Sequence, residues 1–247
     1  ETVYFGKRIN EFDVSLTRPM GGEESTIYSI SENREVEYPD GYKYGLAPVE
    51  LSVHASRDKR GAPLIIKREN GSYVTDFIYV SHKIYKGIKN LDNLPCAHGG
   101  NCSTVEFLLK ERTRELYVKH RVTIFDDKDI IIKNFEIINN SGKDVVLNRA
   151  MSMQLDLPSI DYTLNHFSGR WAQERNRVEN KVIDGVQEIG SNRGISSAEE
   201  NPFVFLKSEN AGLDYGEVIG FNLIYSGNFK FRLFSDYYKS IHITYGI

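Results

Sequence analysis

The side chains best suited to chemistry lie in one short segment, residues 169–175. It contains two guanidinium groups, the only indole of the chain and a carboxylate, on Arg170, Arg175, Trp171 and Glu174. An indole face can stack on the apolar side of a pyranose while Arg and Glu hydrogen-bond its hydroxyls, so Trp171 is a candidate for substrate binding. The alternative, which we prefer for Arg170, Glu174 and Arg175, is a structural or interface loop held by an Arg-Glu ion pair with the ring packed beneath it.

Acid-base chemistry could draw on six histidines: His54, His82, His98, His120, His166 and His242. We expect these to be surface or interface residues, because most histidines serve no catalytic role. His120 differs, since it falls in the apolar phase of a predicted strand and a hydrogen-bonded core position suits it. Independent catalysis by a His-Glu pair is therefore disfavoured.

The two cysteines, Cys96 and Cys102, are too few for a disulfide framework, and we expect free thiols. A metal site built on them and His98 would need a fourth ligand and a tighter spacing. We predict neither a metal nor a cofactor.

Composition indicates a soluble globular protein, with 40% hydrophobic and 26% charged residues. The net charge of -3 gives no electrostatic reason to expect nucleic acid or an anionic membrane as a partner. No apolar run approaches membrane-spanning length. These features lead us to expect the cytoplasm of a microbe.

Period-two alternation of apolar and polar residues recurs along the chain and predicts strands. One run covers 116–125, and another covers 147–157 with Gln154 and Asp156 on its polar face. Residues 124–146 predict two strands joined by a hairpin at 140–142. With helical periodicity almost absent, we predict an all-β fold in which two large antiparallel sheets pack face to face, as one domain over 1–247.

Several segments follow a recognisable order. They read GRWAQER at 169–175, GSNRGISS at 190–197, NPF at 201–203 and GEVIGFNLIYSGN at 216–228. Further matches are YFGKR at 4–8, TDFIYVSHKIYKG at 75–87 and MSMQLDLP at 151–158. Together they resemble the amino-terminal β-domain of microbial α-galactosidases (melibiases) of glycoside hydrolase family 36. The resemblance covers nearly the whole chain.

This resemblance implies a β-supersandwich of the galactose mutarotase-like group, truncated here at both ends and followed in the family by a catalytic (β/α)8 barrel. Retaining glycosidases use two carboxyl groups about 5–5.5 Å apart. In the family both belong to the barrel, one of them in a Lys-x-Asp strand. The chain offers only Lys128-Asp129-Ile130, in the wrong order and in a predicted hairpin strand, so we expect no catalytic residue here.

The family's tetramers further imply a loop that enters a neighbouring subunit's active site, with an Asp-aromatic-Arg triplet after a Tyr-Pro pair. Tyr38-Pro39 is present, but the triplet is missing. Tyr42, Lys43 and Tyr44 could still contact a substrate, or they could form a solvated turn over a sheet edge. Arg193 is expected in a structural or subunit-interface role, with ligand binding as the alternative. Relatives usually carry a histidine where this chain reads Ala198-Glu199-Glu200.

We therefore expect a non-catalytic β-sandwich domain of a retaining α-galactosidase that removes terminal α-linked galactose from melibiose- or raffinose-type oligosaccharides. Its partners would be its own barrel, further copies of itself in a homo-oligomer and the galacto-oligosaccharide. Two alternatives stay open: a stand-alone carbohydrate-binding domain, and a mutarotase-like sugar epimerase.

Overall fold

A computed structural model describes residues 50–54, 58, 60–95, 97–157, 159–196, 199–236 and 239–247. This part of the chain contains only strands, which confirms the all-β prediction. In chain order they are β1 (Leu64–Arg68), β2 (Phe77–Lys86), β3 (Cys102–Glu111), β4 (Leu116–Phe125), β5 (Ile131–Asn139), β6 (Val145–Ala150), β7 (Met153–Leu157), β8 (Tyr162–Arg170), β9 (Gln173–Lys181), β10 (Gly185–Ser191), β11 (Glu200–Ser208), β12 (Val218–Asn222), β13 (Phe229–Ser235) and β14 (Ile241–Gly246).

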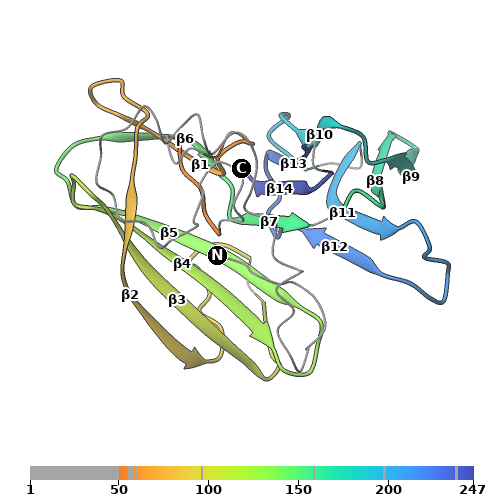
Figure 1. The fold of residues 1–247 in the computed structure, drawn as a ribbon, viewed down its shortest axis with the longest axis horizontal. Helices are drawn as coiled ribbons and strands as arrows, with labels where there is room; N and C mark the ends of the chain where they lie inside the picture. Colours follow the sequence, from red (N-terminus) through yellow and green to blue (C-terminus); the bar gives the residue numbers. More distant parts are fainter. Residues whose placement is uncertain are drawn as a thin grey trace.

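Within the described residues, the strands pair antiparallel and form four sheets (Figure 1). The long sheet has the order β2-β3-β4-β5, the central sheet β10-β13-β14-β7, the outer sheet β12-β11-β8-β9, and the short sheet contains β1 and β6. The division is finer than the two large sheets expected from the sequence. One reason is that consecutive strands leave one sheet to join another.

The predicted run 147–157 shows this change of sheet. It is split between β6, which pairs with β1, and β7, which pairs with β14. Between them Met151 is buried, and its N–H donates to the carbonyl of Pro63 at 2.9 Å. The N–H of Ala150 donates to the carbonyl of Ile247 at 2.7 Å. These bonds satisfy the backbone where the chain crosses between sheets.

The predicted hairpin at 140–142 is wrong. A turn does form there, closed by a 3.1 Å bond from the Ser141 N–H to Asn139 Oδ1, but β5 pairs with β4 and β6 with β1. The turn thus connects two sheets. The tripeptide 128–130 lies in the loop between β4 and β5, where we expected a strand. Strand β4 forms a hairpin with β5, and residues 126–130 connect the two strands.

The main core lies between the central and outer sheets. Its members alternate along their strands as predicted, and they include Phe229, Phe231, Leu233, Ile241, Ile243 and Tyr245 on the central sheet and Leu164, Val204, Leu206 and Phe221 on the outer sheet. A smaller core, made of Val53, Leu64, Ile66, Leu116 and Val118, joins the short sheet to one end of the long sheet. Burial of these side chains drives the packing of the layers.

Strand β4 begins and ends as the alternation predicts, but its burial changes phase beyond His120, where Arg121 and Thr123 are buried and Ile124 is 51% exposed. Arg121 is fully buried and ion-paired with Glu106 and Glu136. Burial alone would raise the pKa of Glu106, yet hydrogen bonds from Arg121 and Lys83 outweigh it and the pKa falls below its usual value. The pKa of Glu136 is lowered chiefly by its bond from Arg121. Pattern alone cannot distinguish such a paired ion from a solvated one.

Candidate functional site

The segment with the indole forms the tip of the β8–β9 hairpin. Arg170 and Gln173 are paired residues, so Trp171 and Ala172 make the turn between them. Arg170 Nε donates to Gln173 Oε1 at 2.8 Å, which fixes the base of the turn. The Trp171 side chain is 90% exposed. An indole this exposed on an ordered hairpin is available to a ligand or to another protein surface.

The preferred interpretation of this loop is wrong in two details. The ring is not packed beneath the loop, and Glu174 accepts a bond from the Ala172 N–H at 2.8 Å where we expected an ion pair with Arg. The hairpin carries a bulge, in which Glu174 and Arg175 lie opposite Gly169. Arg175 takes the left-handed conformation with φ of 56°. A Cβ on Gly169 would lie 2.3 Å from the Gln173 carbonyl oxygen, so the bulge requires glycine.

The second motif segment, 191–196, is bound to residues 225–228 near the end of the fourth. The Ser196 N–H donates to the Ser226 carbonyl at 2.9 Å, and the Gly194 N–H donates to Asn228 Oδ1 at 2.6 Å. Arg193 forms an ion pair with Glu199 and is 62% exposed. The polar residues of these motifs therefore hold loops in place, and an interface role for Arg193 stays a prediction.

All four motif segments meet at one end of the sandwich. The Gly169 N–H donates to the carbonyl of Glu199 at 3.0 Å. The carbonyl of Pro202, in the third motif segment, accepts from the Tyr245 hydroxyl. It also accepts from the Leu223 N–H of the fourth segment at 3.4 Å. Loops far apart in the sequence thus share one hydrogen-bonded frame, which explains why the motifs are rich in Gly, Ser and Asn.

Comparison with known proteins agrees with this arrangement. The family model described as the glycosyl hydrolase family 36 N-terminal domain matches residues 1–247. The chain belongs to this family. It is 35% identical over 201 residues to the α-galactosidase AgaA of Geobacillus stearothermophilus, covering 80% of this chain and 28% of that protein. The α-galactosidase Mel36A of Lactobacillus acidophilus is 27% identical over 99% of this chain and 33% of its own length.

Solved family 36 structures have the same fold. The crystal structure of AgaA superposes with a TM-score of 0.87 at 30% identity, and covers 99% of this chain and 34% of AgaA. The α-galactosidase of Lactobacillus brevis gives 0.84 at 30% identity, over 99% of this chain and 33% of the other. AgaA variants have been crystallised with raffinose and with stachyose. The chain spans about a third of the length of these relatives.

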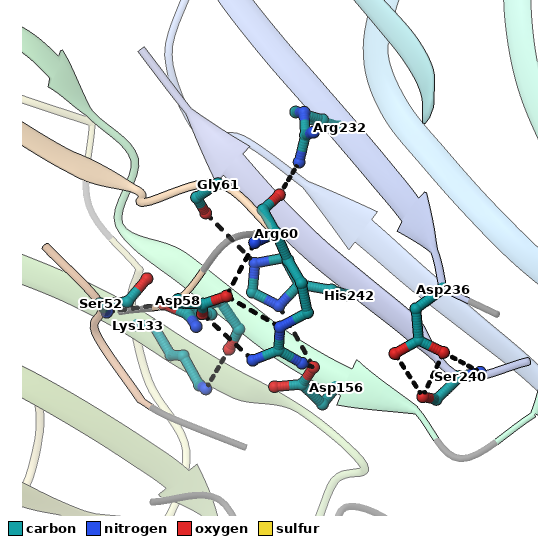
Figure 2. A network of polar contacts seen from close by, with 11 residues as sticks. Ser52, Asp58, Arg60, Gly61, Lys133, Asp156, Arg232, Asp236, Ser240 and His242 are labelled. Atoms are coloured by element: carbon teal, nitrogen blue, oxygen red, sulfur yellow. Dashed lines mark hydrogen bonds and ion pairs between the residues drawn. The ribbon is translucent and has the colours of Figure 1, made fainter. Parts of the chain in front are cut away.

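Among the described residues of this family 36 domain, one group of charged side chains is buried between layers. Arg60 lies between two carboxylates and donates to Asp156 through Nη1 and to Asp58 through Nε, the latter at 2.9 Å (Figure 2). His242 completes the group: its Nδ1 lies 3.2 Å from Asp156 Oδ1 and its Nε2 lies 3.3 Å from the Gly61 carbonyl. Arg232 donates to the carbonyl of Arg60. We call Asp58, Arg60, Asp156 and His242 the buried charge cluster.

Electrostatics favour the ionised forms of Asp58 and Arg60. Burial by itself would raise the pKa of Asp58, but hydrogen bonds and the positive charge of Arg60 outweigh it and lower the pKa. Burial opposes the charge of Arg60 as well, and Asp58 with Asp156 overcomes that effect and raises its pKa. Two carboxylates do stand near each other here, but a guanidinium occupies the space between them. A glycosidase needs that space for substrate.

A second set of buried contacts joins the long sheet to the central sheet. Lys133 on β5 donates through Nζ to the carbonyl of Gln154 on β7 at 3.0 Å and forms a 2.6 Å ion pair with Glu50. Glu50 also contacts His120 Nε2 at 3.1 Å. The prediction of a hydrogen-bonded core position for His120 is confirmed, since its residue is only 2% exposed. These contacts connect the long sheet to the central sheet, and the buried charge cluster connects the segment before β1 to the central sheet.

The other predicted residues are scattered or lie elsewhere. Tyr42, Lys43, Tyr44 and Cys96 fall outside the described residues. His54, His82 and His98 are exposed, as expected, whereas His242 is buried, contrary to expectation. Cys102 is a buried free thiol. Within the described ranges no group of three or more His, Cys, Asp or Glu could hold a metal ion, and no helix is long and apolar enough to cross a membrane.

Sequence reasoning missed the buried charge cluster. A signal was present, because Gln154 and Asp156 were assigned to the polar face of a strand and His242 alternates with Ile241 and Ile243. What the pattern could not reveal is that Ser52, Arg60 and Gly61 bind the polar groups of this face. Every residue of β14 is buried as a result, apolar ones toward the core and polar ones toward the cluster.

Proposed function

We propose that this chain is the amino-terminal scaffold domain of a retaining α-galactosidase that releases terminal α-linked galactose from melibiose- or raffinose-type oligosaccharides. Hydrolysis is assigned to carboxylates outside these 247 residues, on a catalytic barrel in the same polypeptide. The observation that carries the proposal is the structural match to AgaA. This match covers 99% of the chain and therefore includes the motif loops.

The geometry of the acidic residues supports a scaffold role. Within the described ranges, Asp58 and Asp156 are two largely buried carboxylates, and both are bound to Arg60. Breaking such a pair would leave buried charges without compensation. The pair is therefore suited to holding layers together, because Arg60 occupies the hydrogen-bonding positions that a substrate would need.

The proposal includes assembly and location. The domain packs against its barrel, forms part of a homo-oligomer, tetrameric by family resemblance, and works in the cytoplasm of a microbe. The exposed hairpin at Trp171 and the exposed Arg193 offer surfaces for such contacts, because large exposed apolar groups often mark interaction sites.

An assay of the longer polypeptide that carries these residues tests the proposal. We expect it to release galactose from melibiose and raffinose, and to hydrolyse a chromogenic α-galactoside faster than the matching β-galactoside or N-acetyl-α-galactosaminide. Release of a different sugar, or a preference for the N-acetylated substrate, would refute the assignment of substrate. Size-exclusion chromatography with light scattering would test the oligomer separately.

A second candidate, a carbohydrate-binding domain acting through Trp171, is favoured by one observation: the 90% exposure of this indole. Because the chain has one tryptophan, its fluorescence reports on this position alone. A change in emission on titration with galactose, melibiose or raffinose would support this candidate. Emission that stays constant up to high sugar concentration would exclude a stacking role for Trp171.

A further inference from the structure

A cleft of about 360 Å³ opens between the outer sheet and the edge strand of the central sheet. Leu164 and Ile189 from the main core contribute its apolar part, while His166, Asn180 and Glu200 add polar groups. The backbone of β10 forms the opposite wall, around Gly190. The volume falls within the range of about 300–1,000 Å³ typical of small-ligand sites.

Two polar atoms at this cleft lack a hydrogen-bond partner. They are His166 Nδ1 and Glu200 Oε2, which lie 3.4 Å apart as an ion pair without a hydrogen bond. The other oxygen of Glu200 is fixed by the Ser168 hydroxyl, which donates to Oε1 at 3.1 Å. Buried polar groups are normally hydrogen-bonded, so a site with two unsatisfied atoms calls for an explanation. A ligand that draws the two groups into hydrogen bonds would supply one.

The lining defines the chemical class of that ligand. Glu200 makes the cleft unfavourable for an anion, whereas the charge of Glu188 is balanced by ion pairs with Lys230 and Arg232. The described residues form no cluster suited to a metal ion. A neutral molecule with an apolar face and adjacent hydroxyls matches the remaining features. Carboxylate, imidazole and amide groups can each bond a hydroxyl while Leu164 and Ile189 contact C–H groups.

The location strengthens this interpretation. Glu200 directly follows Glu199, whose carbonyl accepts from Gly169 and whose carboxylate pairs with Arg193. The motif loops that form the hydrogen-bonded frame at this end of the sandwich therefore also fix one wall of the cleft. We propose that the cleft is a saccharide-binding site, in which Glu200, His166 and Asn180 bind sugar hydroxyls independently of Trp171.

Saturation-transfer difference NMR on the folded 247-residue chain tests this site, with galactose and melibiose as probes and glycerol as a small polyol control. We expect transfer to both sugars and none to glycerol. Glu200→Gln and His166→Gln, which nearly preserve side-chain volume, should each weaken binding about tenfold or more, since each removes a bond to a charged or strongly polar group. Lys86→Met, which removes an exposed ion pair on the long sheet, is the matched control and should bind like the wild type.

Circular dichroism of each variant establishes that its fold is intact, and Asn180→Ala provides a third variant at an exposed position. Absence of transfer to either sugar in the wild-type chain would overturn the proposal. So would binding by the Glu200 and His166 variants that equals that of the wild type, a loss of binding in Lys86→Met as large as in those variants, or transfer to glycerol as strong as to the sugars. The result does not depend on whether the longer protein is an α-galactosidase, because hydrolysis by that protein is measured separately.

Discussion

Arg60 and Asp156, 96 positions apart in the chain, are joined by a hydrogen bond from Nη1 to Oδ1 in the interior of the domain. This bond attaches the segment before β1 to the polar face of the central sheet. Lys133 and Glu50 make a comparable connection to the long sheet. The long sheet and the segment before β1 are therefore held to the central sheet partly by largely buried ions, and such contacts are costly to break.

Replacing Arg60 should destabilise the domain strongly. Arg60→Met keeps the length of the side chain but leaves Asp58 and Asp156 buried without their cation, and we expect a loss of about 3–5 kcal/mol in unfolding free energy. Urea unfolding followed by circular dichroism measures it. The control is Lys86→Met, which removes an exposed ion pair with Asp126 and should cost about 1 kcal/mol or less. Equal losses in the two variants would contradict a structural role for the cluster.

Acid should destabilise the domain through its paired carboxylates. The folded-state pKa values of Asp58, Glu106 and Glu136 lie below their usual values. The folded state therefore binds protons less readily than the unfolded state, so stability is full above the ordinary carboxyl pKa of about 4 and falls as pH drops below it. Urea midpoints between neutral pH and about pH 3 should show this decline. Glu106→Gln should make the decline shallower, and an unchanged slope would count against the ion pair with Arg121.

The bulge in the β8–β9 hairpin should reject a side chain at Gly169. A Cβ there meets backbone atoms of Gln173 and Glu174, which cannot move aside cheaply. We expect Gly169→Ala to cost about 1–3 kcal/mol, as overpacking usually does. Gly220→Ala is the matched control, since its nearest neighbour at 3.3 Å is the side chain of Phe203. A smaller loss at Gly169 than at Gly220 in urea unfolding would show that the bulge is not rigid.

Removing Trp171 should leave the stability of the domain almost unchanged. Its side chain is 90% exposed, so Trp171→Ala gives up little buried area, and we expect a change within about 0.5 kcal/mol. The emission maximum of the wild-type chain should resemble that of a solvated indole. A strongly blue-shifted maximum, or a large loss of stability in the variant, would show that the ring is packed in solution.

Much of the architecture could be predicted from sequence where one face of a strand is apolar. Strand β4 starts at Leu116 and ends at Phe125 as expected, and the alternations on β13 and β14 point toward the main core. The prediction failed where pairing partners decide the outcome. The run 147–157 divides at Met151 because its two parts bind different sheets, and a periodic pattern contains no information about partners that are distant in sequence.

The candidate sites were harder to predict for a related reason. The exposure of Trp171 depends on a two-residue turn. The ion pairs of Arg121 depend on the neighbouring strands β3 and β5, and that of Asp156 depends on Arg60, which is distant in sequence. Charged residues are seldom buried, so a solvated position is the natural expectation from sequence. His166 and Glu200 come together through the pairing of β8 with β11, which only the sheet order reveals.

The central claim is that these strands form a scaffold without a hydrolytic centre of their own. The most direct test is the initial rate of chromogenic α-galactoside hydrolysis by the folded 247-residue chain, compared with buffer and with the chain carrying Asp58→Asn and Asp156→Asn. We predict that all three rates are the same. A rate above buffer that disappears in the double variant would contradict the account, because it would place a working pair of carboxylates inside this domain.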